Sequence, residues 1–187
     1  MRLRGLPRPV STDPCATDAA ALRRLAGGDV SALAEIYDRH APALLRFSIR
    51  VVGARDAEDL VQATFMTAFK VASAYDGRGE SARPWLYGIL SKHIHERRRS
   101  LLRCARAILR LGGEAVRVPT TADRSDLSRG LELLSEAKRV VLLLAEVEGY
   151  SAHEIADLLG VPVGTVWTRL HHARRQLRVF YGDPEST

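Results

Sequence analysis

The 187-residue sequence lacks the features that mark several classes of protein. It contains two cysteines, Cys15 and Cys104, which lie far apart and form no CxxC pair. The sequence therefore predicts neither a disulfide framework nor a structural zinc site. No apolar run is long enough to span a membrane, and the N-terminus lacks the apolar core of a signal peptide. We expect a protein with no membrane insertion that resides in the cytoplasm.

Catalytic and metal-binding motifs are also missing. The chain has no phosphate-binding loop, GxSxG elbow, HExxH motif or kinase signature. His93 and His95 are two positions apart on an expected helix, so their side chains point in different directions and cannot share a metal ion. His171 and His172 are adjacent and diverge in the same way. The sequence predicts no enzyme, no metal site and no cofactor.

Helical periodicity and positive charge are what the sequence does have. Hydrophobic residues make up 46% of the chain, enough to bury a core, and no strand-like alternation occurs. The formal net charge of +6 and the pI of about 9.8 favour a polyanionic partner. We predict an all-α protein of two small helical domains joined by a flexible linker. The expected divisions are a disordered tail at 1–15, a first domain at 16–102, the linker at 103–130, a second domain at 131–181 and a tail at 182–187. Continuation of the preceding helix through 103–111 is left open.

The most informative stretch runs from Gly149 to Arg178 and predicts two helices joined by a tight turn. Ser151 and Glu154 have the spacing of a capping box, in which each side chain bonds a free amide of the first turn. Gly160 is expected to end the first helix, because glycine adopts the left-handed conformation at little cost. This helix–turn–helix pattern is typical of DNA-binding domains, although a basic helix at the end of a domain can also be simply solvated.

The second helix of this pair carries the candidate DNA contacts. Val166, Leu170, Ala173 and Leu177 recur at helical spacing and are expected to face the core. The other positions are polar, basic or aromatic, and the DNA-binding candidates among them are Thr165, Trp167, Thr168, Arg169, His171, His172, Arg174 and Arg175. The first turns of such a helix enter the major groove, so we predict that Trp167 reads bases. The alternative is that Trp167 packs against the preceding helix.

A helix with an acidic first turn is predicted in the first domain, beginning at Asp56. Carboxylates suit the positive end of a helix dipole, so capping is one interpretation of Asp56, Glu58 and Asp59. Together with Gln62, these acids also suit a protein-binding surface on a basic chain, and the spacing leaves both interpretations open. In the helix before it, we expect Pro42 to cause a kink or an interruption.

A glycine-containing loop at 75–81 precedes a basic helix for which Ser81 is a candidate cap. Trp85 is expected on the buried side of that helix rather than as a platform for bases. The arginines at 97–99 are either a solvated helix end or a phosphate contact. Further along, residues 131–147 are predicted to form one apolar helix beneath the helix–turn–helix.

Two motifs in this order resemble bacterial sigma factors of the extracytoplasmic-function (ECF) class. The first is DAEDLVQATF at 56–65 with PWLYGI at 84–89, and the second is EGYSAHEIADLLGVPVGTVWTRLHHARRQLR at 148–178. The resemblance covers about residues 18–180. It departs from the family at Trp167, where a basic residue usually follows the GTV motif. It implies that the chain binds core RNA polymerase and directs promoter recognition, DNA opening and transcription initiation.

The resemblance also implies a role for each candidate site. The first domain looks like sigma region 2, which would bind the β′ coiled coil of bacterial core RNA polymerase through Asp56, Glu58, Asp59 and Gln62. It would engage the minus-ten promoter element through Tyr75, Arg78, Lys92, His93, Arg97 and Arg98. The second domain looks like region 4, which would read the minus-thirty-five element and contact the polymerase β flap. Many family members are restrained by an anti-sigma factor, and this chain would permit such a partner.

Two other functions remain open from the sequence. One is a stand-alone helix–turn–helix regulator that does not bind core polymerase and uses residues 18–100 for ligand binding or dimerisation. The other is a sigma mimic that binds polymerase without initiating. Binding to core polymerase distinguishes the regulator from a sigma factor, and run-off transcription distinguishes the mimic.

Overall fold

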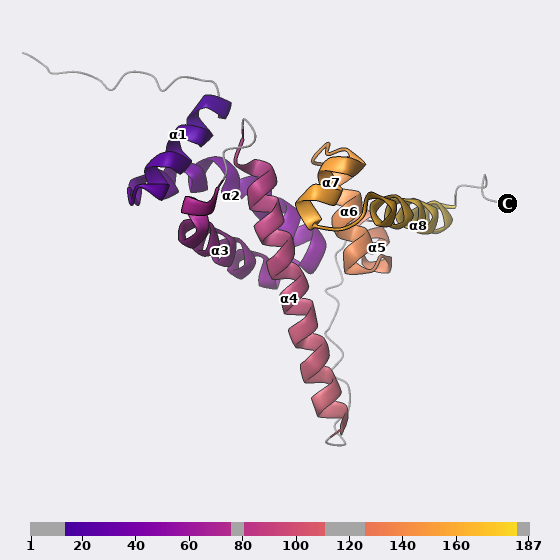
Figure 1. Ribbon diagram of the computed structural model, residues 1–187. Coiled ribbons are helices and arrows are strands. Elements are labelled where there is room, and N and C mark those ends of the chain that lie inside the picture. The colour runs from indigo at the N-terminus through magenta and orange to yellow at the C-terminus, as the bar shows by residue number, and fades with distance from the viewer. Residues whose placement is uncertain (1–13, 76–80, 111–125, 183–187) are drawn as a thin grey trace, which may run out of the picture.

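The computed structural model describes residues 14–75, 81–110 and 126–182, and these form helices and short turns without any strand (Figure 1). The all-α prediction is confirmed for this part of the chain. The elements are α1 (Pro14–Ala26), α2 (Ser31–Val52), α3 (Ala54–Val71), the short 3₁₀ helix η1 (Ala72–Ala74), α4 (Arg83–Arg110), α5 (Asp126–Leu133), α6 (Glu136–Glu146), α7 (Ala152–Leu159) and α8 (Val163–Tyr181).

Helices α1 to α4 form a first bundle, in which α2 and α3 pack against each other and α4 packs against α3. Its centre is made by large side chains that are almost completely removed from water, including Leu44 and Phe47 of α2 and Tyr87 and Leu90 of α4. The rings of Phe47 and Tyr87 meet edge to face with centroids 5.0 Å apart, a favourable aromatic geometry. This packing fixes where α3 and the first turns of α4 present their polar faces.

Helices α5 to α8 form a second bundle around Val141 and Leu144 of α6, Ile155 of α7 and Val166 of α8. The two bundles are in contact, since α4 packs against α7 and α2 packs against α6. Figure 1 shows α7 beside the N-terminal half of α4, while the C-terminal half of α4 extends beyond both bundles. Buried apolar residues of the two bundles therefore belong to one continuous cluster.

Pro42 does not interrupt α2, and the helix predicted to begin at Asp56 begins earlier. Helix α2 runs without interruption through Pro42, whose side chain lies exposed beside a groove. A proline inside a helix loses the bond to the carbonyl four residues earlier and its ring crowds that carbonyl, but neither effect ends α2 at Pro42. The next helix begins at Ala54 rather than at Asp56, because Gly53 has a φ of 92° and joins the two helices directly. Asp56 therefore lies within the first turn.

The apolar stretch at 131–147 is two helices rather than one. Ser135 has an extended conformation, with a ψ of 150°, and separates α5 from α6. The guanidinium of Arg139 donates to the carbonyl of Leu134 at this break, at 3.1 Å. The same guanidinium donates to the carbonyl of Val51 at the end of α2, at 2.6 Å. One arginine therefore satisfies two helix ends, and it does so across the two bundles.

Parts of the expected tail and linker are helical. Helix α1 includes Pro14 and Cys15, which the sequence assigned to a disordered tail. Helix α4 continues to Arg110 and α5 begins at Asp126, so residues 103–110 and 126–130 of the expected linker are helical. Residues 1–13, 76–80, 111–125 and 183–187 lie outside the described part of the chain, and so do the predictions that fall on them.

Candidate nucleic-acid and protein interfaces

The turn between α7 and α8 has the geometry that its sequence predicts. The amide of Glu154 donates to Ser151 Oγ at 3.3 Å, and the amide of Ser151 donates to Glu154 Oε2 at 2.8 Å. These bonds form a complete capping box, and the bond from the Ser151 amide lowers the pKa of Glu154. Gly160 ends α7 in the left-handed conformation, with a φ of 64°. The prediction of a helix–turn–helix is confirmed at each of these positions.

Helix α8 is amphipathic, with one apolar face and one polar face. Val166, Leu170 and Ala173 are buried, and Leu177 is partly buried. Trp167 is 54% exposed, which favours the base-reading interpretation over packing against the preceding helix. The side chains of Thr168, His171, His172, Arg174 and Arg175 are also exposed, whereas those of Thr165 and Arg169 are partly buried.

Some of the polar side chains on α8 already have partners. The guanidinium of Arg174 donates to Glu146 Oε1 of α6 from Nη2 at 2.7 Å and from Nε at 3.0 Å. The hydroxyl of Thr168 donates to the carbonyl of Gly164 at 2.8 Å, within the helix itself. The Arg175 side chain forms no hydrogen bond or ion pair with the described residues, and it lines the same groove as Lys138. A phosphate contact by Arg174 must therefore break an ion pair, but a contact by Arg175 need not.

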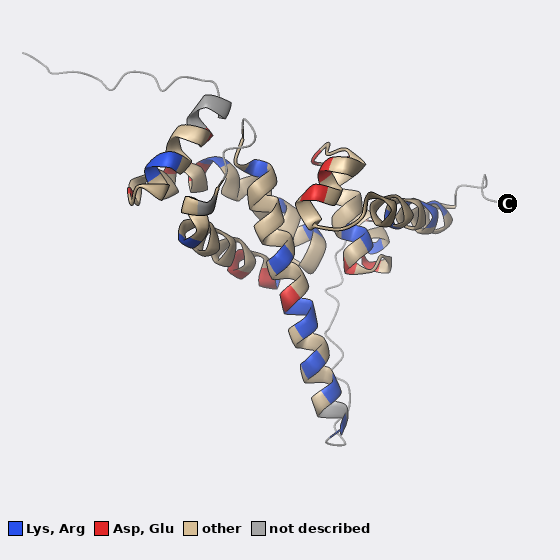
Figure 2. Ribbon diagram, in the orientation of Figure 1, with Lys and Arg blue, Asp and Glu red and all other residues tan. Residues whose placement is uncertain are grey.

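The acidic cluster on α3 is divided between a structural and a surface role. Asp56 forms an ion pair with Arg97 of α4 at 2.5 Å, so it holds two helices together. Glu58, Asp59 and Gln62 are exposed on α3. Figure 2 shows acidic residues near the start of α3 and basic residues recurring along α4 to its C-terminal end.

The exposed part of the acidic cluster borders a groove between α2 and α3. Glu58 and Gln62 line one side, and Tyr37, Asp38 and Pro42 line the other side. Tyr37 is 46% exposed and stacks at a tilt on Phe65, with ring centroids 4.8 Å apart. An apolar floor with an acidic rim is a suitable surface for a protein partner.

The candidates for the minus-ten element do not form one free surface. Lys92 is exposed on α4, but His93 bonds Thr67 of α3 at 2.9 Å and Arg97 binds Asp56. The ring of Tyr75 packs on Trp85 with centroids 5.1 Å apart. Trp85 is partly buried against the core, as the sequence predicts. Arg98 is partly buried beside α6, and Arg78 lies outside the described residues.

Sequence reasoning missed Asp18, which is 1% exposed at the centre of a polar network. Its Oδ2 accepts from His40 Nε2 at 2.9 Å, from the amide of Ala82 at 2.9 Å and from Ser81 Oγ at 3.0 Å, and its Oδ1 is paired with Arg39. Burial opposes ionisation, yet the bonds from His40 and Ala82 hold the pKa of the Asp18 carboxyl well below its usual range. The predicted cap is also present, since Ser81 Oγ accepts from the backbone amide two residues later at 3.2 Å. Asp18 therefore fixes the start of α4.

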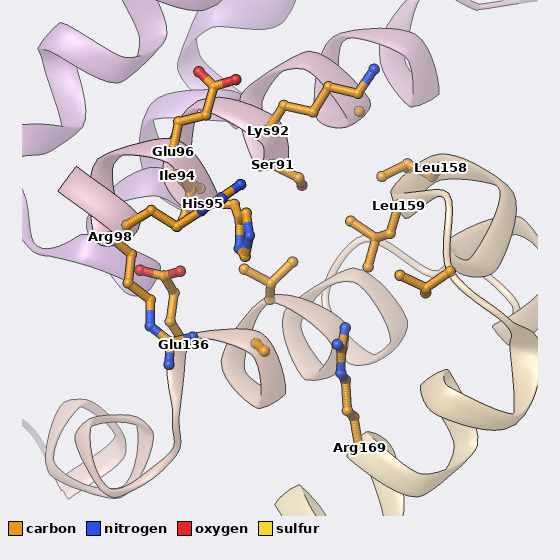
Figure 3. Close-up of a pocket in the computed structure, with 15 residues that line it drawn as sticks. Ser91, Lys92, Ile94, His95, Glu96, Arg98, Glu136, Leu158, Leu159 and Arg169 are labelled. Atoms are coloured by element: carbon orange, nitrogen blue, oxygen red, sulfur yellow. The ribbon is translucent and has the colours of Figure 1, made fainter. Parts of the chain in front are cut away.

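A cleft of about 350 Å³ lies between the two bundles (Figure 3). Ser91 and His95 of α4 point into it from one side and Arg169 of α8 from the other, while Leu158 and Leu159 of α7 form an apolar wall. At its edge Glu136 of α6 is near Arg98, and burial raises the pKa of Glu136 while the neighbouring cations oppose this shift. The cleft brings together residues predicted to contact two separate promoter elements.

The described residues supply no group of three His, Cys, Asp or Glu side chains suited to a metal ion. Nor is any helix within the described ranges both long and apolar enough to cross a bilayer.

Comparison with known families assigns both halves of the chain. Residues 36–104 match the family described as Sigma-70 region 2, and residues 124–177 match Sigma-70, region 4. The ECF RNA polymerase sigma factor SigL of Mycobacterium tuberculosis is 31% identical over 161 residues, which cover 82% of this chain and 91% of SigL. The RNA polymerase sigma factor CarQ of Myxococcus xanthus is 32% identical over 175 residues, covering 88% of this chain and 97% of CarQ.

Two solved structures share the fold. The sigma factor RpoE in complex with the anti-sigma factor NepR from Bartonella quintana is similar with a TM-score of 0.63 and 27% identity, over 77% of this chain and 92% of RpoE. The structure of CnrH in complex with the cytosolic domain of CnrY is similar with a TM-score of 0.64 and 24% identity, over 90% of this chain and 99% of CnrH. The second likeness concerns the fold alone.

Proposed function

The chain belongs to the ECF RNA polymerase sigma factors, and from this premise we propose which of its surfaces perform the steps of transcription initiation. As a sigma factor it associates with core RNA polymerase and directs initiation at promoter DNA. This assignment rules out a stand-alone regulator, the alternative left open by the sequence. The roles of individual residues below are proposals.

The second bundle reads the minus-thirty-five element through α8. The observation that carries this proposal is the exposure of Trp167 at 54% on a helix whose opposite side is buried. The first turns of a recognition helix enter the major groove, where the indole of Trp167 and the side chains of His171 and His172 meet base edges. Arg175 lies a turn further on and contacts a phosphate. Thr165, Thr168, Arg169 and Arg174 complete the proposed contact surface.

The first bundle binds core polymerase through the exposed acids of α3. Glu58, Asp59 and Gln62 face solvent beside the groove between α2 and α3. They are placed to dock on the β′ coiled coil, and the second bundle contacts the β flap. Asp56 supports this surface indirectly, because its carboxylate is held by Arg97. Removing the charge of Asp56 would loosen the α3–α4 contact as well as the docking surface.

The first turns of α4 and the loop before them engage the minus-ten element and open it. Tyr75 stands at the start of that loop, and aromatic faces hold unstacked bases by stacking. Trp85, on which the Tyr75 ring packs, belongs to the core side of α4. Lys92 supplies an exposed cation on the same helix. Arg78, His93, Arg97 and Arg98 remain candidates in this role, although His93 and Arg97 must leave their partners on α3 to reach DNA.

The protein acts where core polymerase and promoter DNA are found, so we place it in the cytoplasm, without enzymatic activity of its own. RpoE is described in complex with an anti-sigma factor, and an anti-sigma factor is a suitable partner for this chain as well. In this chain, exposed apolar residues on α5 and α8, including Leu127 and Tyr181, border a groove in the second bundle. That groove suits either the β flap or such a partner.

Run-off transcription with reconstituted holoenzyme tests the proposal. The purified chain is mixed with bacterial core polymerase and a promoter obtained by binding-site selection with the holoenzyme. A transcript that starts downstream of the selected site, and that core polymerase alone does not make, is the expected result. Binding to core without any transcript would instead identify a sigma mimic.

A further inference from the structure

The two bundles meet along one face of α4. Arg83 in the first turn of α4 forms an ion pair with Glu148, whose side chain is only 5% exposed. One turn later the ring of Tyr87 meets the ring of Tyr150 edge to face, with centroids 6.0 Å apart. At Gly88 a Cβ atom would lie 3.3 Å from the carbonyl of Leu158 in α7, so glycine permits the close approach of the two helices.

The segment that covers α4 is firmly attached to the second bundle. The amide of Glu148 donates to the carbonyl of Leu143 at 3.1 Å, and the amide of Tyr150 donates to the carbonyl of Leu144 at 3.0 Å. Burial raises the pKa of Tyr150 to about 12, although Arg83 opposes the shift. Tyr150 therefore stays neutral at physiological pH. Because this segment is bonded to α6, separation of the second bundle from α4 withdraws Glu148 from Arg83, whose own side chain is 41% exposed.

The face of α4 covered by the second bundle combines apolar packing with buried polar atoms. Within the described residues, Ser91 Oγ and Arg83 Nε are buried without a hydrogen-bond partner, and so is Nε of Arg139, which bonds across the seam through its other nitrogens. Buried polar groups in stable interiors are nearly always hydrogen-bonded. Each of these atoms gains a bond to water if the bundles separate. The seam therefore leaves polar atoms unsatisfied that water would bond in an open form.

The contact between the bundles is also incompatible with binding both promoter elements at once. The names of the minus-ten and minus-thirty-five elements give their positions on the promoter, which are about 25 base pairs apart. At about 3.4 Å per base pair this separation along the DNA is on the order of 85 Å. In this structure Lys92 of α4, a minus-ten candidate, and Arg169 of α8, a minus-thirty-five candidate, line the same cleft (Figure 3). The structure is thus a closed form, and promoter binding requires an open one.

We propose that Arg83 is an additional contact to promoter DNA in the minus-ten region and that Glu148 occupies it, in place of a phosphate, in the free protein. This inference rests on the proposed function and extends it. Arg83 lies in the same helical turn as Trp85, and its guanidinium binds a carboxylate as it would bind a phosphate. Separation of the two bundles releases Arg83 from Glu148, and Arg83 then lies beside the promoter segment where the duplex is opened. The second domain therefore masks part of the surface of the first.

The test compares two substitutions that break the same ion pair from opposite sides. Glu148→Gln frees Arg83, whereas Arg83→Gln removes it. Both full-length variants are compared with the parent by small-angle X-ray scattering and by binding to a duplex that carries both promoter elements. Asp157→Asn, on an exposed acid of α7, controls for the loss of a negative charge, and Arg50→Gln, on an exposed arginine of α2, controls for the loss of a positive charge.

Both variants are expected to increase the radius of gyration, because both break the seam. Glu148→Gln is expected to bind the duplex up to about tenfold more tightly than Asp157→Asn does. Arg83→Gln also opens the seam but lacks the cation, so it should bind more weakly than Glu148→Gln and show a dependence of log K on log salt that is lower by roughly 1, the change expected for one lost phosphate contact. Equal affinities of Glu148→Gln and Arg83→Gln would overturn the DNA contact. An unchanged scattering profile for Glu148→Gln would overturn the masking.

A third variant opens the seam without changing charge. Gly88→Gln places a side chain against the Leu158 carbonyl, so it should expand the protein and tighten duplex binding as Glu148→Gln does. If it expands the protein but leaves duplex binding unchanged, masking of DNA contacts is wrong. Run-off transcription by the parent separates this inference from the proposed function. If the parent protein drives no transcription, the proposed function is wrong. If the parent is active but the variants bind the duplex as the parent does, only the masking of Arg83 by Glu148 is refuted.

Discussion

Trp167 gives the recognition helix a chemistry that an arginine cannot provide at the same position. Its indole has one N–H donor and a broad apolar face, and it is 54% exposed. Arginine forms two parallel bonds with guanine in the major groove, whereas an apolar surface suits a thymine methyl group. The base preference next to Trp167 should therefore differ from that of relatives with a basic residue there.

We predict that Trp167→Arg shifts the preference at one or two adjacent base pairs, by about 1–3 kcal/mol if a guanine contact forms. Selection of binding sites from a random pool, with the parent and the variant in holoenzyme, measures this change. Since Trp167 is exposed, the substitution should leave the melting temperature nearly unchanged. An identical selected motif for both proteins would show that Trp167 does not read bases.

Arg175→Ala is predicted to act differently from the Trp167 substitution. A phosphate contact carries no sequence information, so its loss should weaken binding to all sequences alike. The slope of log K against log salt should fall by roughly 1. Titration of holoenzyme with matched and mismatched promoter duplexes at several salt concentrations gives both quantities. A loss confined to the matched duplex would assign Arg175 to base reading.

At the scale of the element, α7 and α8 depend on the caps at their ends. Ser151→Ala removes the acceptor for the Glu154 amide, and loss of an N-cap costs about 1 kcal/mol. We predict that the free energy of unfolding of this variant, measured by chemical denaturation, is lower than that of the parent by this amount. Ser151→Asp keeps a capping oxygen and should unfold like the parent. Equal destabilisation by both variants would mean that the hydroxyl itself, and not capping, is required.

Helix α3 has a surface role that can be separated from its packing. Asp59→Lys reverses an exposed charge and should weaken binding to core polymerase, by about tenfold at low salt, with a smaller effect at high salt because a rim charge acts mainly on the association rate. Helical content should not change. Glu96→Lys makes the same charge change on α4, where the side chain is 73% exposed. If the two variants bind core equally well, α3 is not the docking surface.

At the scale of the whole molecule, Asp18 connects α1, α2 and the start of α4. Its pKa in the folded protein lies below the ordinary value of 3.8. The stabilisation from its ionised form is therefore fully present above about pH 4 and is lost as pH falls through the folded-state value. Hydrogen bonds to a charged group contribute about 2 kcal/mol, so Asp18→Asn should be destabilised by that order at pH 7.

The measurement that checks Asp18 is the free energy of unfolding of parent and variant from pH 7 down to pH 3. The difference between the two should be constant above about pH 4 and should shrink below it, because only the parent loses a carboxylate. Asp157→Asn, on the surface of α7, should show no such dependence. A difference between parent and Asp18→Asn that stays constant to pH 3 would contradict ionisation of Asp18 in the folded state.

Local chemistry in the sequence determined the helices and the recognition motif. The capping box at Ser151, the left-handed Gly160 and the inward positions on α8 all depend on residues within about one or two turns of each other, which is why they could be predicted. The break at Ser135 was missed because apolar residues continue through it and it carries no glycine or proline. The start of α3 was misplaced because Gly53 joins two helices without a separate cap.

The tertiary structure alone decided which candidate side chains are free. Asp18 bonds the amide of Ala82, which is 64 positions away, and Arg83 bonds Glu148, which is 65 positions away. Asp56 and Arg97 were expected on separate surfaces but bind each other. Such pairs follow from how the helices pack, and helical periodicity says only that a side chain points outward. It cannot say whether that side chain meets water, DNA or another helix of the same chain.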